Sequence, residues 1–329
     1  MFKDRLLITA ILFSGGFARA QSAGLSGPIA GFTFDAPTRT IRAVIGSMGS
    51  ASLGPAIDDM LDFASIAPRR NYGIAIRGEQ VCFVTALDGL QPQIAAIPQA
   101  SAPDGVAWSE DGSVAAFYSR SGNWIQIYRG FPASIQAGAK LDIRLPGSLS
   151  SIAVDSRGRQ IAIGVGGDPG GVYQVVADQS FAPLLEMSAP VSLAFSSDGS
   201  TLYALDHASN QISEVNLANS AVQTWPAGAD DAIAIRVAVD AAGVGVLYVA
   251  GRSSHLLLSL ERASHRTIAT AQLSFAPSLI EPLRAGGFLL TQRSSRSDPL
   301  WTFLNTGQPL IFFVPPPIPE GPRQEVPHQ

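Results

Sequence analysis

Few residues of this chain could do acid–base or metal chemistry, and there are only four histidines among them. The histidines are His207, His255, His265 and His328. No two of them have the spacing of a helical zinc motif. His207 is the best candidate for a catalytic residue, because it follows a strand-like run in the segment DHASN, in a loop between strands.

Oxygen-bearing side chains near His207 suggest a second possibility, a site for a hard cation. Asp206 and Asn210 flank the histidine, and Asp168 lies in an earlier loop. Carboxylate and amide oxygens are the ligands that calcium prefers. Asp and Asn are also the residues that shape turns. We favour turn formation over catalysis or metal binding for Asp206 and Asn210, and we predict no cofactor.

Other catalytic motifs are missing from the sequence. The glycine-rich segment 164–171 (GVGGDPGG) lacks the G-K-[ST] of a phosphate-binding loop, and there is no G-x-S-x-G elbow for a serine nucleophile. The pair Arg69-Arg70 is interpreted as solvated surface charge. The question of an enzymatic activity therefore stays open, with a non-catalytic role favoured.

The segment Val191–Asp206 (VSLAFSSDGSTLYALD) has the pattern of a β-hairpin. Two alternating apolar runs flank Asp198-Gly199, and an Asp-Gly pair supplies the positive φ of a tight turn. Similar hairpins recur along the chain. Their turn glycines are Gly78, Gly112, Gly158, Gly199, Gly243 and Gly287.

A recurrence of roughly forty-odd residues, with two more strand-like runs after each hairpin, is typical of β-propeller blades. The segments FSSDGSTLYALD and WSEDGSVAAFYS resemble the S-P-D-G hairpin of bacterial secreted YVTN-type and WD40-like repeats. This resemblance implies an all-β propeller with six recognisable four-stranded blades. A further hairpin at 31–46 closes the ring or supplies part of a seventh blade. One short helix is predicted over 55–65.

The resemblance also implies an alternative function, because some propeller lactonases use a histidine or a calcium ion at the channel mouth. In those proteins a glutamate on the inner strands takes part. We predict that no blade here offers one, since the glutamates are expected at turns or on outer runs. Those of the propeller domain are Glu79, Glu110, Glu186, Glu214, Glu261 and Glu281.

The first twenty residues have the pattern of a signal peptide. Lys3 and Arg5 precede the apolar run 6–13, and Ala18-Arg19-Ala20 gives an A-x-A cleavage site after Ala20. The sequence thus predicts a signal peptide at 1–20, a linker at 21–30, a propeller domain at 31–314 and a proline-rich flexible tail at 315–329. The mature protein is expected to be secreted or periplasmic, without a transmembrane segment.

The formal net charge of −4 and the lack of a basic cluster argue against nucleic acid as a partner. We therefore predict an exported, monomeric and non-catalytic propeller that binds a protein or an envelope ligand. The alternative is a lactonase-like hydrolase with a metal or His207-centred site at the mouth of the channel.

Overall fold

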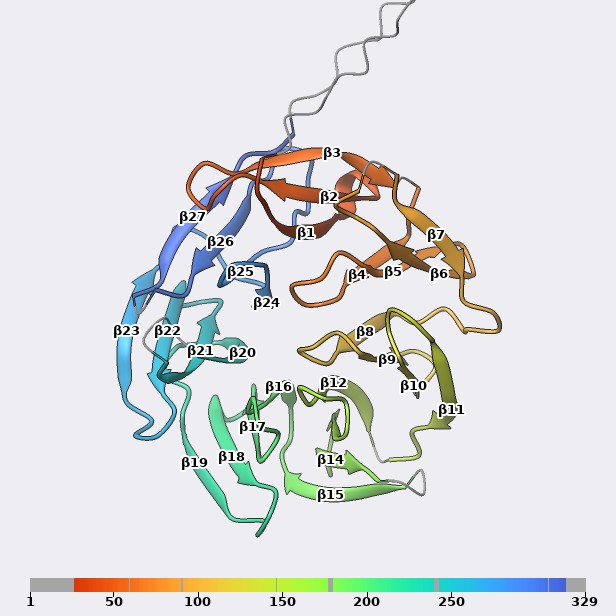
Figure 1. Ribbon diagram of the computed structural model, residues 1–329. Helices are drawn as coiled ribbons and strands as arrows, with labels where there is room; N and C mark the ends of the chain where they lie inside the picture. The colour runs from red at the N-terminus through yellow and green to blue at the C-terminus, as the bar shows by residue number, and fades with distance from the viewer. Residues whose placement is uncertain are drawn as a thin grey trace, which may run out of the picture.

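The protein is a ring of seven β-sheets arranged around a central axis (Figure 1). The computed structural model describes residues 27–317 apart from 59, 90, 146, 177–179, 240–242 and 307. Six sheets have four antiparallel strands and the first has three. The all-β propeller is confirmed, and the hairpin at 31–46 belongs to a seventh blade.

Blades 1 to 7 are numbered in chain order. Blade 1 contains β1 (Ile29–Asp35), β2 (Thr40–Ile45) and β3 (Ser52–Asp58). Blade 2 contains β4 (Phe63–Ile66), β5 (Gly73–Arg77), β6 (Gln80–Thr85) and β7 (Gln93–Ala96). Blade 3 contains β8 (Gly105–Trp108), β9 (Val114–Ser119), β10 (Trp124–Arg129) and β11 (Gln136–Asp142). Blade 4 contains β12 (Ser148–Val154), β13 (Ile161–Gly166), β14 (Gly171–Val175) and β15 (Phe181–Glu186).

Blade 5 contains β16 (Pro190–Phe195), β17 (Thr201–Asp206), β18 (Gln211–Asn216) and β19 (Val222–Pro226). Blade 6 contains β20 (Ala232–Val239), β21 (Gly245–Gly251), β22 (Leu256–Glu261) and β23 (Thr267–Gln272). Blade 7 contains β24 (Glu281–Pro282), β25 (Gly287–Leu289), β26 (Leu300–Leu304) and β27 (Leu310–Val314). One short 3-10 helix, η1 (Ala36–Thr38), joins β1 to β2.

Two local predictions were wrong. The segment 55–65 does not form a helix, because it contains the end of β3 and the start of β4; an apolar spacing of three and four residues can also arise by chance in two short strands. The hairpin with Gly78 joins the second and third strands of blade 2, whereas Gly112, Gly158 and Gly199 lie between the first and second strands of their blades.

The ring has two faces, which differ in the connections they carry. The turns between the first and second strands of blades 2–7 form one side, which we call the hairpin face. The connections from one blade to the next, and the turns between second and third strands, form the opposite side, which we call the loop face.

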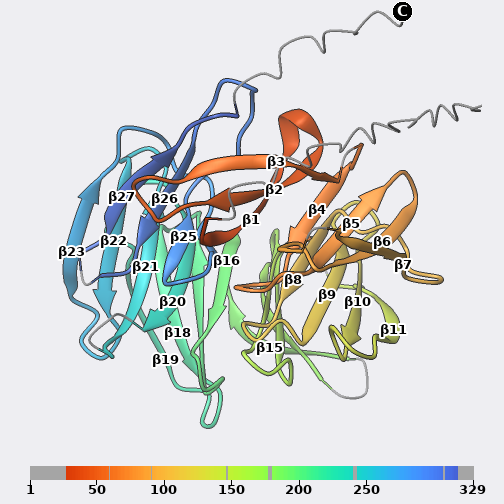
Figure 2. The same cartoon turned by 45° about the horizontal axis from the view of Figure 1, so that its top comes forward.

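Blade 1 runs in the opposite direction to the others. The start of β1 lies at the hairpin face, where Arg284 N–H donates to the Ala30 carbonyl (2.8 Å). Its end lies at the loop face, where Leu61 N–H, just before β4, donates to the Arg39 carbonyl (2.9 Å). The odd number of strands in blade 1 also requires this direction. The chain must leave β3 at the loop face, where β4 begins, so β1 has to start at the hairpin face. Blade 1 fits between blades 7 and 2 in both views (Figures 1 and 2).

The core lies between neighbouring blades, which pack face to face as expected for repeats that cannot bury both faces alone. Between blades 5 and 6, the buried Tyr203 and Leu205 of β17 pack with Ile235 and Val237 of β20. Between blades 6 and 7, Tyr248 of β21 packs on Phe288 and Phe303. Large buried tyrosines on second strands thus fill the gaps between sheets.

The S-x-D-G-S turns are held by their own side chains. The Asp198 carboxylate accepts from the Ser196 hydroxyl (2.5 Å), from Ser200 N–H (3.1 Å) and from the Ser200 hydroxyl (2.9 Å). Asp111 in blade 3 accepts from Ser109 and Ser113 in the same way. The hydroxyl of Ser196 and the donors of Ser200 lower the pKa of Asp198 to about 2. These aspartates therefore stabilise turns.

The ring closes without exchanging a strand between the ends of the described chain. Blade 7 takes all four strands from 281–314, and blade 1 takes all three from 29–58. A buried ion pair crosses the seam, since Arg293 Nη1 lies 2.7 Å from Asp35 Oδ1 with side chains 1% and 0% exposed. Arg42 contacts the second oxygen of Asp35 at 2.8 Å.

None of the helices in the described part of the chain has the length and apolar character needed to cross a membrane. The predicted signal peptide, the linker up to residue 26 and the tail from residue 318 lie outside the described residues.

Candidate functional site

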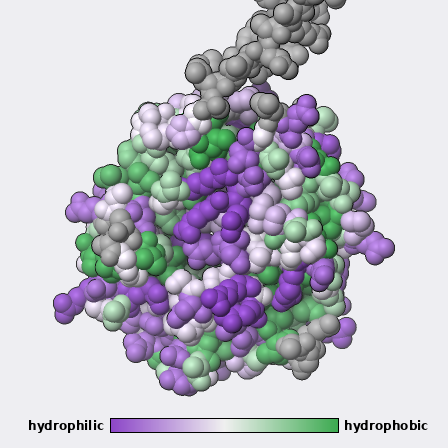
Figure 3. Space-filling view, in the orientation of Figure 1, coloured by the Kyte–Doolittle hydropathy of each residue, from purple (hydrophilic) through white to green (hydrophobic). Residues whose placement is uncertain are grey.

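The central channel contains a cavity of about 540 Å³. All seven blades line it, through β1 and the inner strands or first turns of blades 2–7. Hydrophilic residues gather around the hollow at the centre of the ring (Figure 3). A volume in this range is typical of small-molecule sites.

One position of the inner strands recurs around the channel and defines its wall. The register of strand pairing aligns Ala107, Ala153 and Ala194 of blades 3–5, which face Ala116, Ala162 and Tyr203 on the second strands. We call this position the ring position. Ser65 occupies it in blade 2, two residues before the turn, as the alanines do in blades 3–5.

Blades 6 and 7 carry charged residues at the ring position. Arg236 pairs with Tyr248 as Ala194 pairs with Tyr203, after the same bulge near the start of the strand. Glu281 pairs with Leu289, two residues before the blade 7 turn. A cation and an anion from adjacent blades thus replace the small residues of blades 2–5.

Neither side chain has a direct partner within the described part of the chain, and both line the cavity. Burial lowers the pKa of Arg236, against the opposing effect of the Glu110 carboxylate. Burial raises the pKa of Glu281, and the nearby Arg236 partly offsets this. Glu281 is exposed and Arg236 is half-buried, and both side chains are open to the channel.

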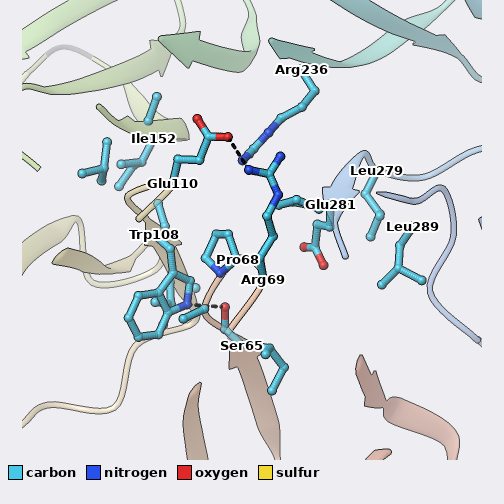
Figure 4. A pocket seen from close by; sticks show the side chains of 18 of the residues that line it. Ser65, Pro68, Arg69, Trp108, Glu110, Ile152, Arg236, Leu279, Glu281 and Leu289 are labelled. Carbon is cyan, nitrogen blue, oxygen red and sulfur yellow. Dashed lines mark hydrogen bonds and ion pairs between the residues drawn. The ribbon is translucent and has the colours of Figure 1, made fainter. Parts of the chain in front are cut away.

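Arg69 brings a second cation to the same place. It lies in the first turn of blade 2, and its Nη1 atom lies 2.9 Å from Glu110 Oε1 in the first turn of blade 3. Figure 4 shows the guanidinium groups of Arg69 and Arg236 pointing toward each other. Two guanidinium groups in this arrangement can hold one carboxylate, because their planar donor sets match its oxygens.

Apolar side chains complete the wall. Trp108, Ile152, Leu279 and Leu289 line the cavity around the charged groups (Figure 4). The indole N–H of Trp108 donates to the Ser65 hydroxyl (3.1 Å), so its polar atom is satisfied within the wall. The cavity therefore offers opposite charges beside an apolar surface.

The residues selected from the sequence lie elsewhere. His207 is in the turn between β17 and β18 on the loop face, its Nδ1 atom 3.5 Å from Asp231 Oδ1, and it does not line the cavity. Asp206 accepts from Ala189 N–H (2.8 Å), Ala208 N–H (3.3 Å) and the Ser209 hydroxyl (2.8 Å). Its carboxylate thus joins this turn to the preceding connection.

Asn210 also binds the backbone with both ends of its amide. Its Nδ2 donates to the Ala229 carbonyl (2.9 Å), and its Oδ1 accepts from Ala232 N–H (3.1 Å). Asp168 is exposed in the β13–β14 turn of blade 4. Within the described residues, no three His, Cys, Asp or Glu side chains are grouped so as to hold a metal ion.

The sequence analysis did not recognise the charged residues of the channel as a site, and its prediction for the glutamates was wrong for Glu281. Glu281 lies on β24, an inner strand, and Glu110 lines the channel from a turn. Arg69 is exposed, as expected of a solvated surface charge, and it also lines the cavity. Aligning the blades by their inner strands would have revealed Arg236 and Glu281 as charges at a position that is Ser or Ala in blades 2–5.

Fold and channel together define a seven-bladed β-propeller with a charged central cavity. No family model matches the chain, and no curated protein matches its sequence. Its fold is similar to that of solved propeller proteins. One is in a nidogen/laminin complex, with a TM-score of 0.50, 14% identity and coverage of 75% of this chain and 92% of that one.

Another similar structure is a catalytically inactive virginiamycin B lyase from Staphylococcus aureus with quinupristin. It has a TM-score of 0.55 and 12% identity, and the match covers 78% of this chain and 84% of that one. At such identities the likeness concerns the fold, because propellers of one architecture carry unrelated functions.

Proposed function

We propose that the protein is an exported, non-catalytic binding module that takes a small ligand in its central channel. The observation that carries this proposal is the pair of unpartnered charges, Arg236 and Glu281, at the ring position. Charged groups with shifted pKa values that line one cavity are typical of functional sites. A ligand of complementary charge would pair with both side chains.

A thermal-shift screen of small charged compounds tests the proposal. The wild type is compared with the double variant Arg236→Gln/Glu281→Gln and with Arg144→Gln, a control on an exposed surface arginine. Compounds that raise the Tm of the wild type and of the control, but not of the double variant, support channel binding. The absence of any such compound, or equal shifts in all three proteins, contradicts it.

Two further measurements test the remaining parts. Mass spectrometry of each bound compound after incubation should recover it unchanged if the module is non-catalytic. Expression of the full chain with its first twenty residues should place a protein that begins at Gln21 outside the cytoplasm. Retention of Met1 in a cytoplasmic protein would refute export.

The lactonase-like alternative has less support. Its candidate His207 lies outside the channel cavity, and the side chains of Asp206 and Asn210 are engaged with the backbone. Lactone turnover in the presence of calcium that is lost in His207→Ala would favour this alternative over a binding module.

A further inference from the structure

The two unpartnered charges of the channel have opposite signs. Arg236 and Glu281 occupy the same ring position in adjacent blades. Each influences the pKa of the other, yet their side chains do not form an ion pair. They thus face the cavity as two separate charges.

This arrangement restricts the ligand. A simple anion would pair with Arg236 but leave the Glu281 carboxylate facing a like charge. A simple cation would satisfy Glu281 and leave Arg236 unpaired. A ligand with both a carboxylate and an ammonium group pairs with both residues at once and leaves no like charges facing each other.

The end of the site that would bind a carboxylate offers two arginines, whereas the other end offers Glu281 alone. Arg69 holds Glu110 through Nη1, and its guanidinium also points toward Arg236 (Figure 4). A guanidinium carries five N–H donors, so Arg69 can bind a second carboxylate while it keeps Glu110. Charge-assisted hydrogen bonds from two arginines then fix the orientation of the ligand.

The size and the wall of the cavity define the rest of the ligand. About 540 Å³ accommodates more than a single small ion. Trp108, Ile152 and Leu279 provide an apolar surface next to the charges (Figure 4). Aliphatic or aromatic side chains of the ligand would lose contact with water against this surface.

We propose that the channel binds a zwitterion, a free amino acid or a short peptide with an apolar side chain. Its carboxylate binds Arg236 and Arg69, and its ammonium group binds Glu281. This inference rests on the proposed function, because it assumes that the channel is the ligand site.

Isothermal titration calorimetry tests the proposal with phenylalanine and with alanyl-phenylalanine. Each is compared with its N-acetyl form, which lacks the ammonium charge, and with its C-terminal amide, which lacks the carboxylate. We expect at least one zwitterion to bind about tenfold or more tighter than both of its derivatives, the effect of a lost charged hydrogen bond.

Variants assign the two ends of the ligand. Arg236→Gln should weaken binding of the zwitterion about tenfold and leave the affinity for the C-terminal amide unchanged. Glu281→Gln should remove the preference for the zwitterion over the N-acetyl form. Arg144→Gln should bind like the wild type, and circular dichroism should show that every variant is folded.

Two results would overturn the proposal that the ligand is a zwitterion. One is that neither zwitterion binds the wild type, and the other is that an N-acetyl form binds as tightly as its parent. If screened compounds of another class still lose binding in Arg236→Gln/Glu281→Gln, the channel remains the ligand site and only the ligand class is refuted. If no compound does, the proposed function fails as well.

Discussion

Replacing Arg293 by methionine should open the seam between blades 1 and 7. The substitution leaves the buried Asp35 carboxylate with Arg42 and the Thr38 hydroxyl, and it removes the bonds from Arg293 to the carbonyls of Asp298 and Arg296. Breaking one partner of a buried pair costs about 3–5 kcal/mol. In a domain of this size, each kcal/mol lowers Tm by about 2 °C, so we expect a loss of about 6–10 °C.

Calorimetry of a double-mutant cycle separates the ion pair from simple loss of packing. Asp35→Asn combined with Arg293→Met should lose less stability than the two single variants together, because the double variant lacks the buried Arg293 charge that Asp35→Asn alone leaves without a carboxylate. Arg144→Met, at a surface pair with side chains 88% and 69% exposed, should change Tm by less than about 1 °C. A fall of under about 2 °C in Arg293→Met, or strict additivity, would refute the reasoning.

Three further predictions concern a turn, a thiol and a tight contact. The pKa of Asp198 is about 2, below its usual 3.8. The contribution of its carboxylate to the stability of the folded protein is therefore present above pH 4 and is lost as the pH falls through 2. The Tm advantage of the wild type over Asp198→Asn should shrink across that range, and because this side chain is largely exposed the effect should stay below about 1 kcal/mol. Burial raises the pKa of the Cys82 thiol, so Ellman's reagent at pH 8 should label the native protein far more slowly than the urea-unfolded chain; equal rates would contradict its burial. A Cβ at Gly105 would lie 2.2 Å from the Tyr118 ring, so Gly105→Ala should cost about 1–3 kcal/mol in urea unfolding, and an unchanged midpoint would show that the ring moves freely.

The fold could be predicted from the sequence because each hairpin carries its own local signal. Asp198-Gly199 and Asp111-Gly112 mark turns through backbone geometry, and the alternation around them marks strands. Blade 2 was assigned out of phase because its first turn contains Arg69 at φ +59° instead of a turn glycine. The reversal of blade 1 has no local signal, since it follows from the number of strands before β4.

The channel site was harder to predict because it is assembled from residues far apart in the sequence. Arg69, Arg236 and Glu281 come from blades 2, 6 and 7, and no linear motif joins them. His207 attracted attention because histidine is rare and lies in a polar loop. In the structure that loop is a turn held by Asp206 and Asn210.

The seam between blades 1 and 7 also affects how the molecule responds to damage at its ends. No sheet contains strands from both ends of the described chain, so fraying of β27 leaves the hydrogen bonds of β1 intact, and the reverse is also true. Each end can therefore be cut, tagged or pulled without unzipping the other. The Arg293–Asp35 contact joins the two ends as a domain interface would, through side chains that can separate and pair again.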